Sequence, residues 1–502
     1  MASPAAVYAR RRPEETTLYK VVQANLATLY GAVDDNALAI RLPGFVRKEL
    51  EGYLDCGLLC RGFARVQCGA CSEKRLVAFG CGGRGFCPSC FGRKMAETAL
   101  NLAQCVVPSD PVRQWVLTFP FAWRSRLGFD APLFSALTRV FVRTVLAFYT
   151  KRMNREGLAR GQSGAVVALQ RTSSDLRLNP HLHVLFLDGV YREEGEEVVF
   201  HALPHLSTRE VGAVLEDAVR RIARYLTRRG LLRADDEASN GAASNGDADH
   251  EHEPTVAQGH ASLCASAASG TSPPAGPELR RKGTPLGALA SKALQFDEPL
   301  CASLDGFTLH AATRAGGLDV RAREALFKYV LRPPIAQERV TLGPEGLVRI
   351  DLKRPFADGT IAIDLDPVSL LCRLAASVPA PGTHTVRDAG VLASASRLRP
   401  RIVLKPEVAA AEDASEAKPK RQGCRYRSWA ELLATLGIDA FECPSCEGRM
   451  RILALVREPN DVRRFLKALG EPTEAPERAP ARGPPYWASR ALRIRSAAHC
   501  AA

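Results

Sequence analysis

The sequence predicts an α+β fold that combines an antiparallel sheet with amphipathic helices. Two β-rich runs, GAVVALQ (164–170) and HLHVLFLDGV (181–190), are joined by a polar segment, and this order is typical of an antiparallel hairpin. The segment 131–153 instead repeats its apolar residues at the spacing of one helix face. Strands and helices therefore alternate along the chain.

The other elements are predicted from the same two periodicities. Residues 15–54 are expected to be helical because apolar residues from Leu18 to Leu29 recur at helical spacing. The segments 113–121 and 305–315 are predicted strands, whereas 207–230 and 319–334 are predicted helices, the last ended by Pro333 and Pro334. Between 234 and 283 the chain turns to Ser, Gly, Ala, Asn and Asp, so we expect a disordered insertion there.

Composition excludes several classes of protein. The 502 residues carry 68 Lys and Arg against 54 Asp and Glu, and the formal charge of +14 favours a polyanionic partner such as nucleic acid. No apolar run approaches the ~20 residues of a membrane-spanning helix, and the N-terminus lacks the apolar core of a signal peptide. We therefore expect a cytoplasmic protein, located at the nucleoid when it is bound to DNA.

Seven of the 15 cysteines lie between positions 56 and 90, and in a reducing compartment such clustering favours metal binding over disulfides. Two Cys-x-x-Cys pairs, Cys68/Cys71 and Cys87/Cys90, are separated by 15 residues. Two such pairs can supply four thiolates to one structural zinc ion. The remaining cysteines of this stretch fit either a second site or buried free thiols: Cys56, Cys60 and Cys81.

A third pair lies near the C-terminus. The phrase FCPSC at Cys87 recurs as FECPSC around Cys443 and Cys446. One pair is only half of a zinc site, so Cys424 or residues elsewhere would have to complete it. A second zinc site and a plain turn with two thiols both remain open at this point.

His181 and His183 lie one residue apart in a predicted strand. Side chains alternate along a strand, so both imidazoles share one face with Leu185 and Leu187. A single histidine in an apolar strand is more often a buried core residue. Two histidines at this spacing favour a metal site.

Two residues are candidates for a third ligand at this site. Folding the hairpin about its polar centre sets Gln170 roughly opposite His181, and His310 lies on a different predicted strand. A His-rich site completed by an oxygen ligand suits Mg²⁺ or Mn²⁺ at a phosphodiester, although zinc also accepts these ligand types.

Tyr329 lies on the predicted helix 319–334. Its ring can pack against the sheet as a structural residue. It can also act as a nucleophile toward a phosphate that a metal ion polarises, provided that the hairpin faces this helix. Basic residues beside Tyr329 and around the second cysteine pair suit contacts with DNA phosphates: Lys328, Arg332, Arg84, Arg93 and Lys94.

The succession GFCPSC, LNPHLHVLFLDGVY, LHA and YVLRPP strongly resembles the rolling-circle transposases of the IS91 family, which are HUH endonucleases. The resemblance runs from about residue 15 to 475, apart from the insertion. HUH denotes His, a bulky hydrophobic residue and His, here His181-Leu182-His183. Some relatives carry two tyrosines four residues apart, but the position four before Tyr329 is Ala325. This chain can therefore support only a single-tyrosine mechanism.

The resemblance implies a central antiparallel sheet flanked by helices, with Tyr329 as nucleophile and metal binding by His181 and His183. It also implies zinc binding by Cys68, Cys71, Cys87 and Cys90 in an N-terminal DNA-binding module. The expected divisions are a helical segment (1–50), a zinc-binding DNA-recognition domain (51–105), an HUH domain in two parts (106–233 and 284–405) around the insertion (234–283), a linker (406–420), a C-terminal Cys-pair region (421–475) and a Pro/Arg-rich tail (476–502).

We expect a transposase that nicks and rejoins single-stranded DNA at the ends of an insertion sequence through a 5′-phosphotyrosine. Its expected cofactors are structural Zn²⁺ and catalytic Mg²⁺ or Mn²⁺, and its partners are the ends of its own element and target DNA. A plasmid replication initiator would use the same chemistry at an origin. A zinc-ribbon nucleic-acid-binding regulator, in which the histidines and the tyrosine are structural, is a rival from another class.

Overall fold

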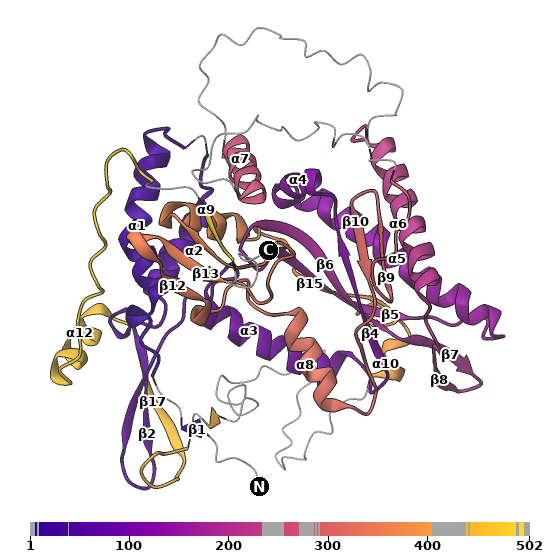
Figure 1. The fold of residues 1–502 in the computed structure, drawn as a ribbon. Helices are drawn as coiled ribbons and strands as arrows, with labels where there is room; N and C mark the ends of the chain where they lie inside the picture. Colours follow the sequence, from indigo (N-terminus) through magenta and orange to yellow (C-terminus); the bar gives the residue numbers. More distant parts are fainter. Residues whose placement is uncertain are drawn as a thin grey trace.

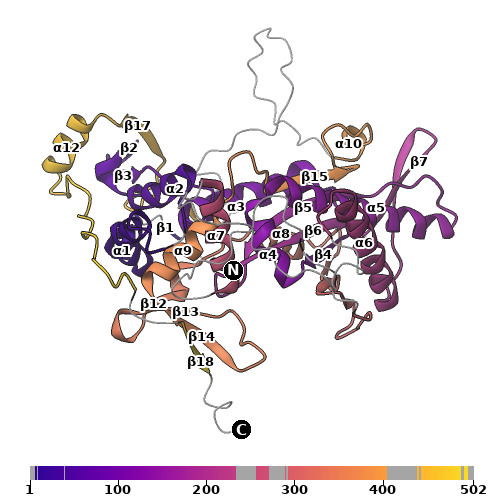
Figure 2. The same cartoon turned by 90° about the horizontal axis from the view of Figure 1, so that it is seen from above.

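The structure is a computed structural model of the chain, and it describes residues 6–7, 10–38, 40–232, 256–270, 286, 289, 292–403, 438–439, 442–487 and 491–495. The described residues form an α+β molecule with several separate sheets, and this confirms the predicted fold class. Figure 2 shows an elongated molecule, with the largest sheet toward one end and helices α1 (Thr17–Asp34) and α2 (Gly44–Asp55) toward the other.

The largest sheet has the strand order β15-β5-β6-β4-β10-β9, and each neighbouring pair along this order is antiparallel. β5 and β6 form the predicted hairpin, and Gln170 pairs with His181 across it, as expected. The short strand β11 pairs with the first two residues of β4. The strands are β4 (Val112–Thr118), β5 (Gly164–Thr172), β6 (Leu178–Leu187), β9 (Cys301–Leu304), β10 (Phe307–His310), β11 (Arg314–Ala315) and β15 (Val386–Gly390).

Helices cover both faces of this sheet (Figure 1). On one face, Trp115, Leu182 and Phe186 pack into a core with α5 (Ala131–Arg155) and α6 (Thr208–Arg228). On the other face, apolar residues of the sheet pack against α3 (Pro88–Asn101) and α8 (Val320–Val330). Leu185 and Leu187 belong to this second face, so the alternation of β6 places His181 and His183 there too.

A second sheet has the order β12-β13-β14-β18 and packs with α1, α2 and α9 (Pro367–Ser377) in a separate core. Helix α9 is buried along its whole length, because it lies between this sheet, α1 and helix α7 (Val256–Ser269). The strands are β12 (Val340–Leu342), β13 (Val348–Asp351), β14 (Thr360–Leu365) and β18 (Leu492–Arg495).

The third sheet joins the two ends of the chain. β17 (Met450–Val456) pairs antiparallel with β2 (Phe63–Cys68), which pairs with β3 (Lys74–Ala78). Helix α12 (Pro459–Ala468) closes the small core under this sheet. The C-terminal region therefore completes the cysteine-rich N-terminal region instead of standing apart from it.

The remaining elements are short. They are β1 (Ala6–Val7), β7 (Gly189–Glu194), β8 (Glu197–Ala202), β16 (Ile438–Asp439), α4 (Arg124–Phe129), α7 (Val256–Ser269), α10 (Arg399–Ile402) and the 3₁₀ or π segments η1 (Pro13–Glu15), η2 (Leu59–Arg61), η3 (Leu102–Val106), η4 (Phe121–Trp123), η6 (Gln337–Arg339) and η7 (Pro344–Gly346).

Helix α7 corrects the expectation that 234–283 forms no core. It lies inside that stretch, packs against α4 and α9, and buries Leu263 and Cys264 completely. Alanine and small residues give this segment little apolar side-chain area, but they allow close helix packing against existing surfaces. Of the predicted insertion, the structure describes only α7 and the residue that follows it, Gly270.

Helix α5 is long and apolar enough to cross a membrane, and it is the only such helix among the described residues. Half of its most apolar 18-residue stretch is nevertheless buried inside the protein. Leu137, Phe141, Val145 and Tyr149 are completely buried in the core against the sheet. This is the environment of a core helix.

The sheet is tied together by a buried carboxylate at the end of β6. Asp188 is completely buried and accepts two hydrogen bonds of 2.9 Å from Arg113, one of 2.6 Å from Arg314 and one of 3.1 Å from Tyr149. These partners belong to β4, β11 and α5. The network therefore fixes the strand that carries the two histidines.

Replacing Asp188 by alanine is expected to lower the free energy of unfolding by about 3–5 kcal/mol, because two arginines would be left near the core without their shared carboxylate. Urea unfolding followed by circular dichroism measures this. The matched control is Asp217→Ala, whose surface pair with Arg221 should contribute about 1 kcal/mol or less. Equal losses in the two variants would contradict the assigned role of Asp188.

Candidate active site and cysteine clusters

The two histidines and the tyrosine come together on the α8 face of the large sheet. The ring centroids of His181 and His183 lie 5.0 Å apart, and the ring of Tyr329 lies 5.9 Å from that of His183 in an edge-to-face arrangement. The hairpin therefore faces the helix that carries Tyr329. His181 and His183 are 8% and 4% exposed, whereas Tyr329 is 45% exposed, so a large substrate can reach the tyrosine.

The hydrogen bond of His181 fixes its tautomer. Nδ1 of His181 lies 2.6 Å from the carbonyl oxygen of Asn179, which can only accept, so Nδ1 carries the proton. The lone pair of Nε2 is then free to bind a metal ion, as is usual for metal-binding histidines. Burial lowers the pKa of His181 to about 4 and that of His183 to about 2, with a further contribution from the positive charge of Arg332. Both imidazoles are therefore neutral lone-pair donors at neutral pH.

Gln114 is a site residue that the sequence reasoning missed. It lies on β4, next to β6 in the sheet, and its amide nitrogen Nε2 lies 2.5 Å from Nδ1 of His183. Amide nitrogen and oxygen are assigned from their surroundings. With the oxygen toward His183, Nδ1 would donate and Nε2 would be free, as at His181. The sequence signal that could have identified it is a glutamine within the otherwise apolar predicted strand 113–121.

The two expected candidates for the third ligand differ in position. Gln170 lies opposite His181, but its Nε2 donates to the carbonyl oxygen of Val330 at 2.8 Å and so ties β5 to the end of α8. His310 pairs with Val116, which separates it from His183 by one whole strand, or about 10 Å at ~4.8 Å per strand. Its Nε2 lies 3.7 Å from Glu298. Gln170 is therefore much closer to the histidine pair than His310 is.

The cysteines form two groups of four, and neither is the predicted set. Cys87 and Cys90 at the start of α3 lie with Cys56 and Cys81, whereas Cys68 and Cys71 lie with Cys443 and Cys446. The expected single site of Cys68, Cys71, Cys87 and Cys90 is therefore wrong in its pairing. The two Cys-x-x-Cys pairs are split because the β2–β3 hairpin carries the first pair away from α3 and toward β17.

The geometry of both clusters fits a tetrahedral zinc ion. In each group the four sulfur atoms lie within 4.8 Å of one another, with contacts of 3.5 to 3.6 Å in the first and 3.4 to 3.5 Å in the second. Four thiolates at ~2.3 Å from zinc would be about 3.8 Å apart. Such closed sites organise a fold and leave no position for a substrate.

The pKa of the cysteines differs within each cluster, because neighbouring thiols stabilise the thiolate of some members and raise the pKa of others, such as Cys71 and Cys87. The backbone amides of Cys71 and Ala70 lower the pKa of Cys68 to about 6. Hydrogen bonds from the thiols of Cys56 and Cys81 lower the pKa of Cys90. Cys60 belongs to neither group, and burial raises its pKa. Cys424, the partner considered for the C-terminal pair, lies outside the described residues.

Two family models match the chain. One is described as "Putative transposase" and matches residues 164–399, and the other is described as "Transposase zinc-binding domain" and matches residues 32–119. Together they cover more than half of the chain. The chain belongs to the IS91 family of transposases. No curated protein and no solved structure is similar enough to this transposase to match it.

The family explains the main features of the molecule. A transposase is a DNA-processing enzyme, so DNA is its partner, and the matched zinc-binding domain together with the cysteine clusters supports structural Zn²⁺. The zinc-binding match is wider than the expected division 51–105 and extends through β4. Cys443 and Cys446 lie outside both matches, although they complete a cluster of the zinc-binding region.

The basic residues expected to contact phosphates are divided between two places. The guanidinium of Arg332 lies 4.3 Å from the ring centroid of Tyr329. Arg84, Arg93 and Lys94 are exposed around the start of α3, and Lys328 is half-buried on α8. In the transposase, Ala325 occupies the exposed position one turn before Tyr329.

Proposed function

We propose that this transposase nicks and rejoins single-stranded DNA at the ends of its element by attack of Tyr329 on a phosphodiester. The observation that carries the proposal is the half-exposed Tyr329 ring beside the buried pair of neutral histidines. Two neutral imidazoles on one face of a strand can bind a metal ion. A solvent-facing phenol next to them can attack a phosphate that this metal ion binds.

In the proposed reaction, His181 and His183 would hold a divalent cation, Mg²⁺ or Mn²⁺, each through Nε2 of its ring. The bound cation would polarise the scissile phosphate and stabilise the charge of the transition state. Tyr329 Oη bonds to phosphorus as the bond from phosphorus to the 3′ oxygen breaks. The phenolic proton passes to solvent, and the departing 3′ oxygen takes up a proton. The products are a 5′-phosphotyrosine and a free 3′-hydroxyl.

Arg332 supports this step in two ways. Its guanidinium stacks against the Tyr329 ring, which limits the motion of both side chains. The same cation lies where the phosphate must approach the phenol, so it offsets the phosphate charge. Strand transfer is the same reaction in reverse, with the 3′-hydroxyl of another DNA end as the attacking group, and it needs no external energy source because the phosphotyrosine conserves the bond energy.

The test is adduct formation on a denaturing gel, using zinc-loaded protein, Mn²⁺ and labelled single strands from the flanks of the gene. Trypsin should release residues 329–339, YVLRPPIAQER, since cleavage does not occur between Arg332 and Pro333. This peptide contains no serine, threonine, histidine or second tyrosine. A nucleotide mass on it would assign the bond to Tyr329, and a nucleotide on any other peptide would overturn the assignment.

The two rival functions predict different results in the same assay. A plasmid replication initiator would form the same adduct, but on origin DNA and not on the ends of an element. A zinc-dependent regulator would bind DNA equally well after removal of Mg²⁺ and Mn²⁺ and would form no adduct. The family match favours the transposase over both rivals.

Gln114→Ala is expected to weaken binding of Mn²⁺ about 10- to 100-fold, because His183 would lose the neighbour that fixes its ring. Titration of Mn²⁺ followed by electron paramagnetic resonance measures binding directly. The matched control is Gln162→Ala, whose side chain is exposed away from the histidines. Unchanged affinity in Gln114→Ala would leave Gln114 a packing residue only.

A further inference from the structure

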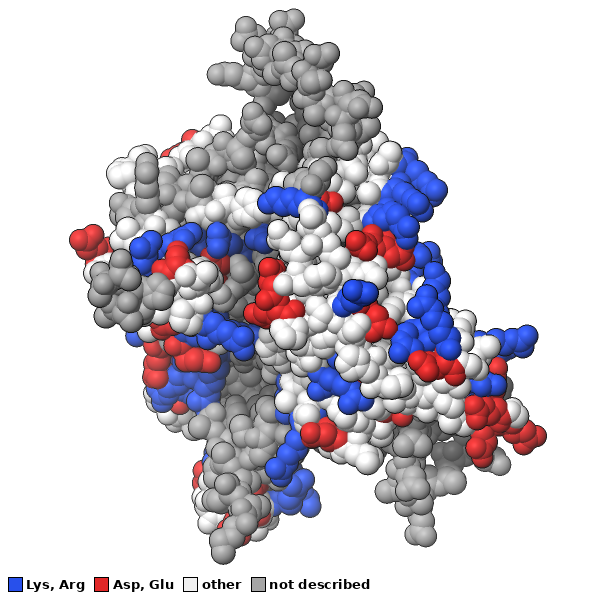
Figure 3. Space-filling model, turned by 45° about the vertical axis from the view of Figure 1, so that its right-hand side comes forward, with Lys and Arg blue, Asp and Glu red and all other residues white. Residues whose placement is uncertain are grey.

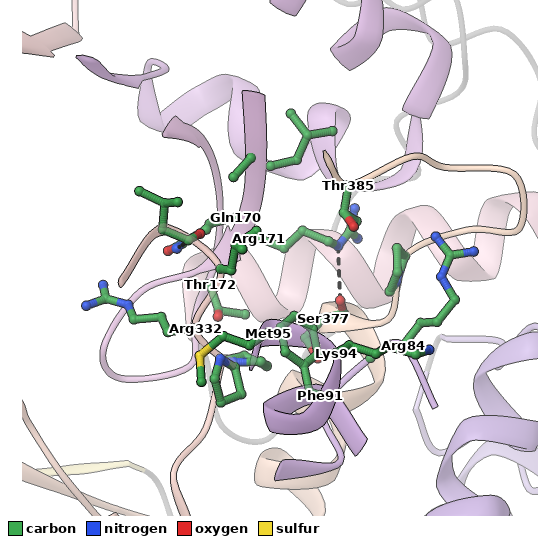
Figure 4. A pocket seen from close by; sticks show the side chains of 18 of the residues that line it. Arg84, Phe91, Lys94, Met95, Gln170, Arg171, Thr172, Arg332, Ser377 and Thr385 are labelled. Atoms are coloured by element: carbon green, nitrogen blue, oxygen red, sulfur yellow. Dashed lines mark hydrogen bonds between the residues drawn. The ribbon is translucent and has the colours of Figure 1, made fainter. Parts of the chain in front are cut away.

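A basic cleft lies beside the proposed active site. It is about 220 Å³ in volume and is bounded by α3, the end of β5, the segment after α8 and the C-terminal end of α9. It is lined by the three residues that follow Tyr329, which are Val330, Leu331 and Arg332. We name it the α3 cleft. Figure 4 shows Arg332 at one side, Arg84 at the other, and Phe91, Lys94 and Met95 on α3 between them.

The charge of the α3 cleft is of one sign. Six cationic side chains line it, and the lining residues, all of which the structure describes, include no Asp or Glu. Elsewhere the surface is mixed: on the face shown in Figure 3, Lys and Arg stand beside Asp and Glu. The lining cations are Arg84, Lys94, Arg171, Arg332, Arg339 and Lys353.

Only some of these cations are available to a ligand. Arg171 is buried and donates to the carbonyl oxygens of Gly128, Ala376 and Ser377, so it is structural. Arg339 likewise donates to the carbonyl oxygens of Asp351 and Ser174. Lys353 is exposed. Partial burial and the neighbouring charges of Arg332 and Arg339 lower its pKa to about 8. Crowded like charges of this kind favour an anionic ligand.

The wall formed by α3 adds apolar side chains to the cationic Lys94. Phe91 and Met95 lie one turn apart on this helix and line the cleft together with Pro334. Hydroxyl groups of Thr98, Thr172 and Ser173 lie among them. Cations combined with an aromatic ring are the features that bind single-stranded nucleic acid, whereas free phosphate needs only the cations. The volume is below the roughly 300–1,000 Å³ of sites for drug-sized ligands, so it suits one base.

We propose that the α3 cleft holds one unpaired nucleotide of the DNA strand next to the scissile phosphate, with its base on Phe91 and Met95 and its phosphates on Arg332 and Lys353. This inference rests on the proposed function and adds a recognition site to it. Cys87 and Cys90 stand at the start of α3, so the first cysteine cluster sets the position of the helix that contacts the base. The zinc-binding region thereby takes part in choosing the nucleotide at the cleavage site.

The first experiment measures binding of single-stranded dT15 to full-length, zinc-loaded protein by fluorescence anisotropy. Phe91→Ala should weaken binding about tenfold, as expected for loss of one base stack. Phe91→Trp should retain binding, and Phe296→Ala, an exposed ring on the α6 side of the sheet, should have no effect. An equal loss on double-stranded DNA, or no loss on dT15, would overturn the proposal.

The second experiment uses the salt dependence of dT15 binding. Lys353→Gln should reduce the slope of log affinity against log salt by about 0.7, the value for one phosphate contact on a single strand. Arg224→Gln, an exposed arginine on α6, is the matched control and should leave the slope unchanged. An unchanged slope for Lys353→Gln would remove that phosphate contact from the proposal.

The third experiment separates this inference from the proposed function. Oligonucleotides with a single abasic site are scanned around the mapped nick, and one position should be sensitive in the wild type but not in Phe91→Ala. If the wild type forms the adduct but Phe91→Ala retains the same sensitive position, the cleft proposal fails and the proposed function stands. If no adduct forms on any strand, the proposed function fails, and the dT15 results alone decide whether the cleft binds an unpaired base.

Discussion

Tyr329→Phe is expected to lower the yield of the covalent DNA adduct by a factor on the order of 10³ or more, because the ring remains but the attacking oxygen is lost. The substitution removes one exposed hydroxyl and should not change stability measurably. The ring should still stack on Arg332, so binding of single-stranded DNA should stay within about twofold of the wild type. Adduct yield on denaturing gels and binding by anisotropy separate these two effects.

A matched control is available on α6. Tyr225 stands below the guanidinium of Arg229, 5.6 Å from its ring centroid, in the same type of cation–π contact as Tyr329 with Arg332. Tyr225→Phe should retain full adduct formation. His181→Ala should lose the adduct as completely as Tyr329→Phe and should also lose Mn²⁺ binding. Adduct formation by Tyr329→Phe would show that another residue is the nucleophile.

The second large effect concerns zinc, of which the native protein is expected to hold two ions per chain. Cys446→Ser should lower the content to about one and release β17 and α12 from β2, because these elements are held by the cluster that the C-terminal pair completes. Zinc is measured with a colorimetric chelator after denaturation, and release is measured by limited proteolysis, which should cut the C-terminal region first.

The two clusters can be distinguished by combining variants. Cys87→Ser and Cys446→Ser should each remove one ion, and the double variant should remove both. A single site of Cys68, Cys71, Cys87 and Cys90 would instead leave Cys446→Ser with its full content. Cys60→Ser is the matched control, since Cys60 lies in the same region but in neither cluster. A native content below two ions would contradict the second site.

Local periodicity predicted the elements of the proposed active site because it depends on neighbours in the chain. The alternation of β6 places both histidines on one face, and Pro333 and Pro334 follow the end of α8 just after Tyr329. Pairing within the hairpin also followed from the sequence, since its connecting loop is short and Gln170 lies opposite His181.

Lateral neighbours in the sheet could not be predicted in the same way. Gln114 contacts His183 only because β4 lies beside β6 in the sheet. The two residues are 69 positions apart in the sequence, and no local pattern fixes which strands become neighbours over such a separation. The same limit applies to the α3 cleft, whose walls come from four distant segments. Lys353 was therefore not predicted as a phosphate contact.

The sequence by itself determined the candidates for the chemistry: the His-Leu-His strand, the single tyrosine and the Cys-x-x-Cys pairs. Only the tertiary structure decided which cysteines share an ion. Each pair is half of a tetrahedral site, and any two pairs can complete it. The pairing of β17 with β2 brings Cys443 and Cys446 to Cys68 and Cys71, across more than 370 residues, and leaves Cys87 and Cys90 to Cys56 and Cys81.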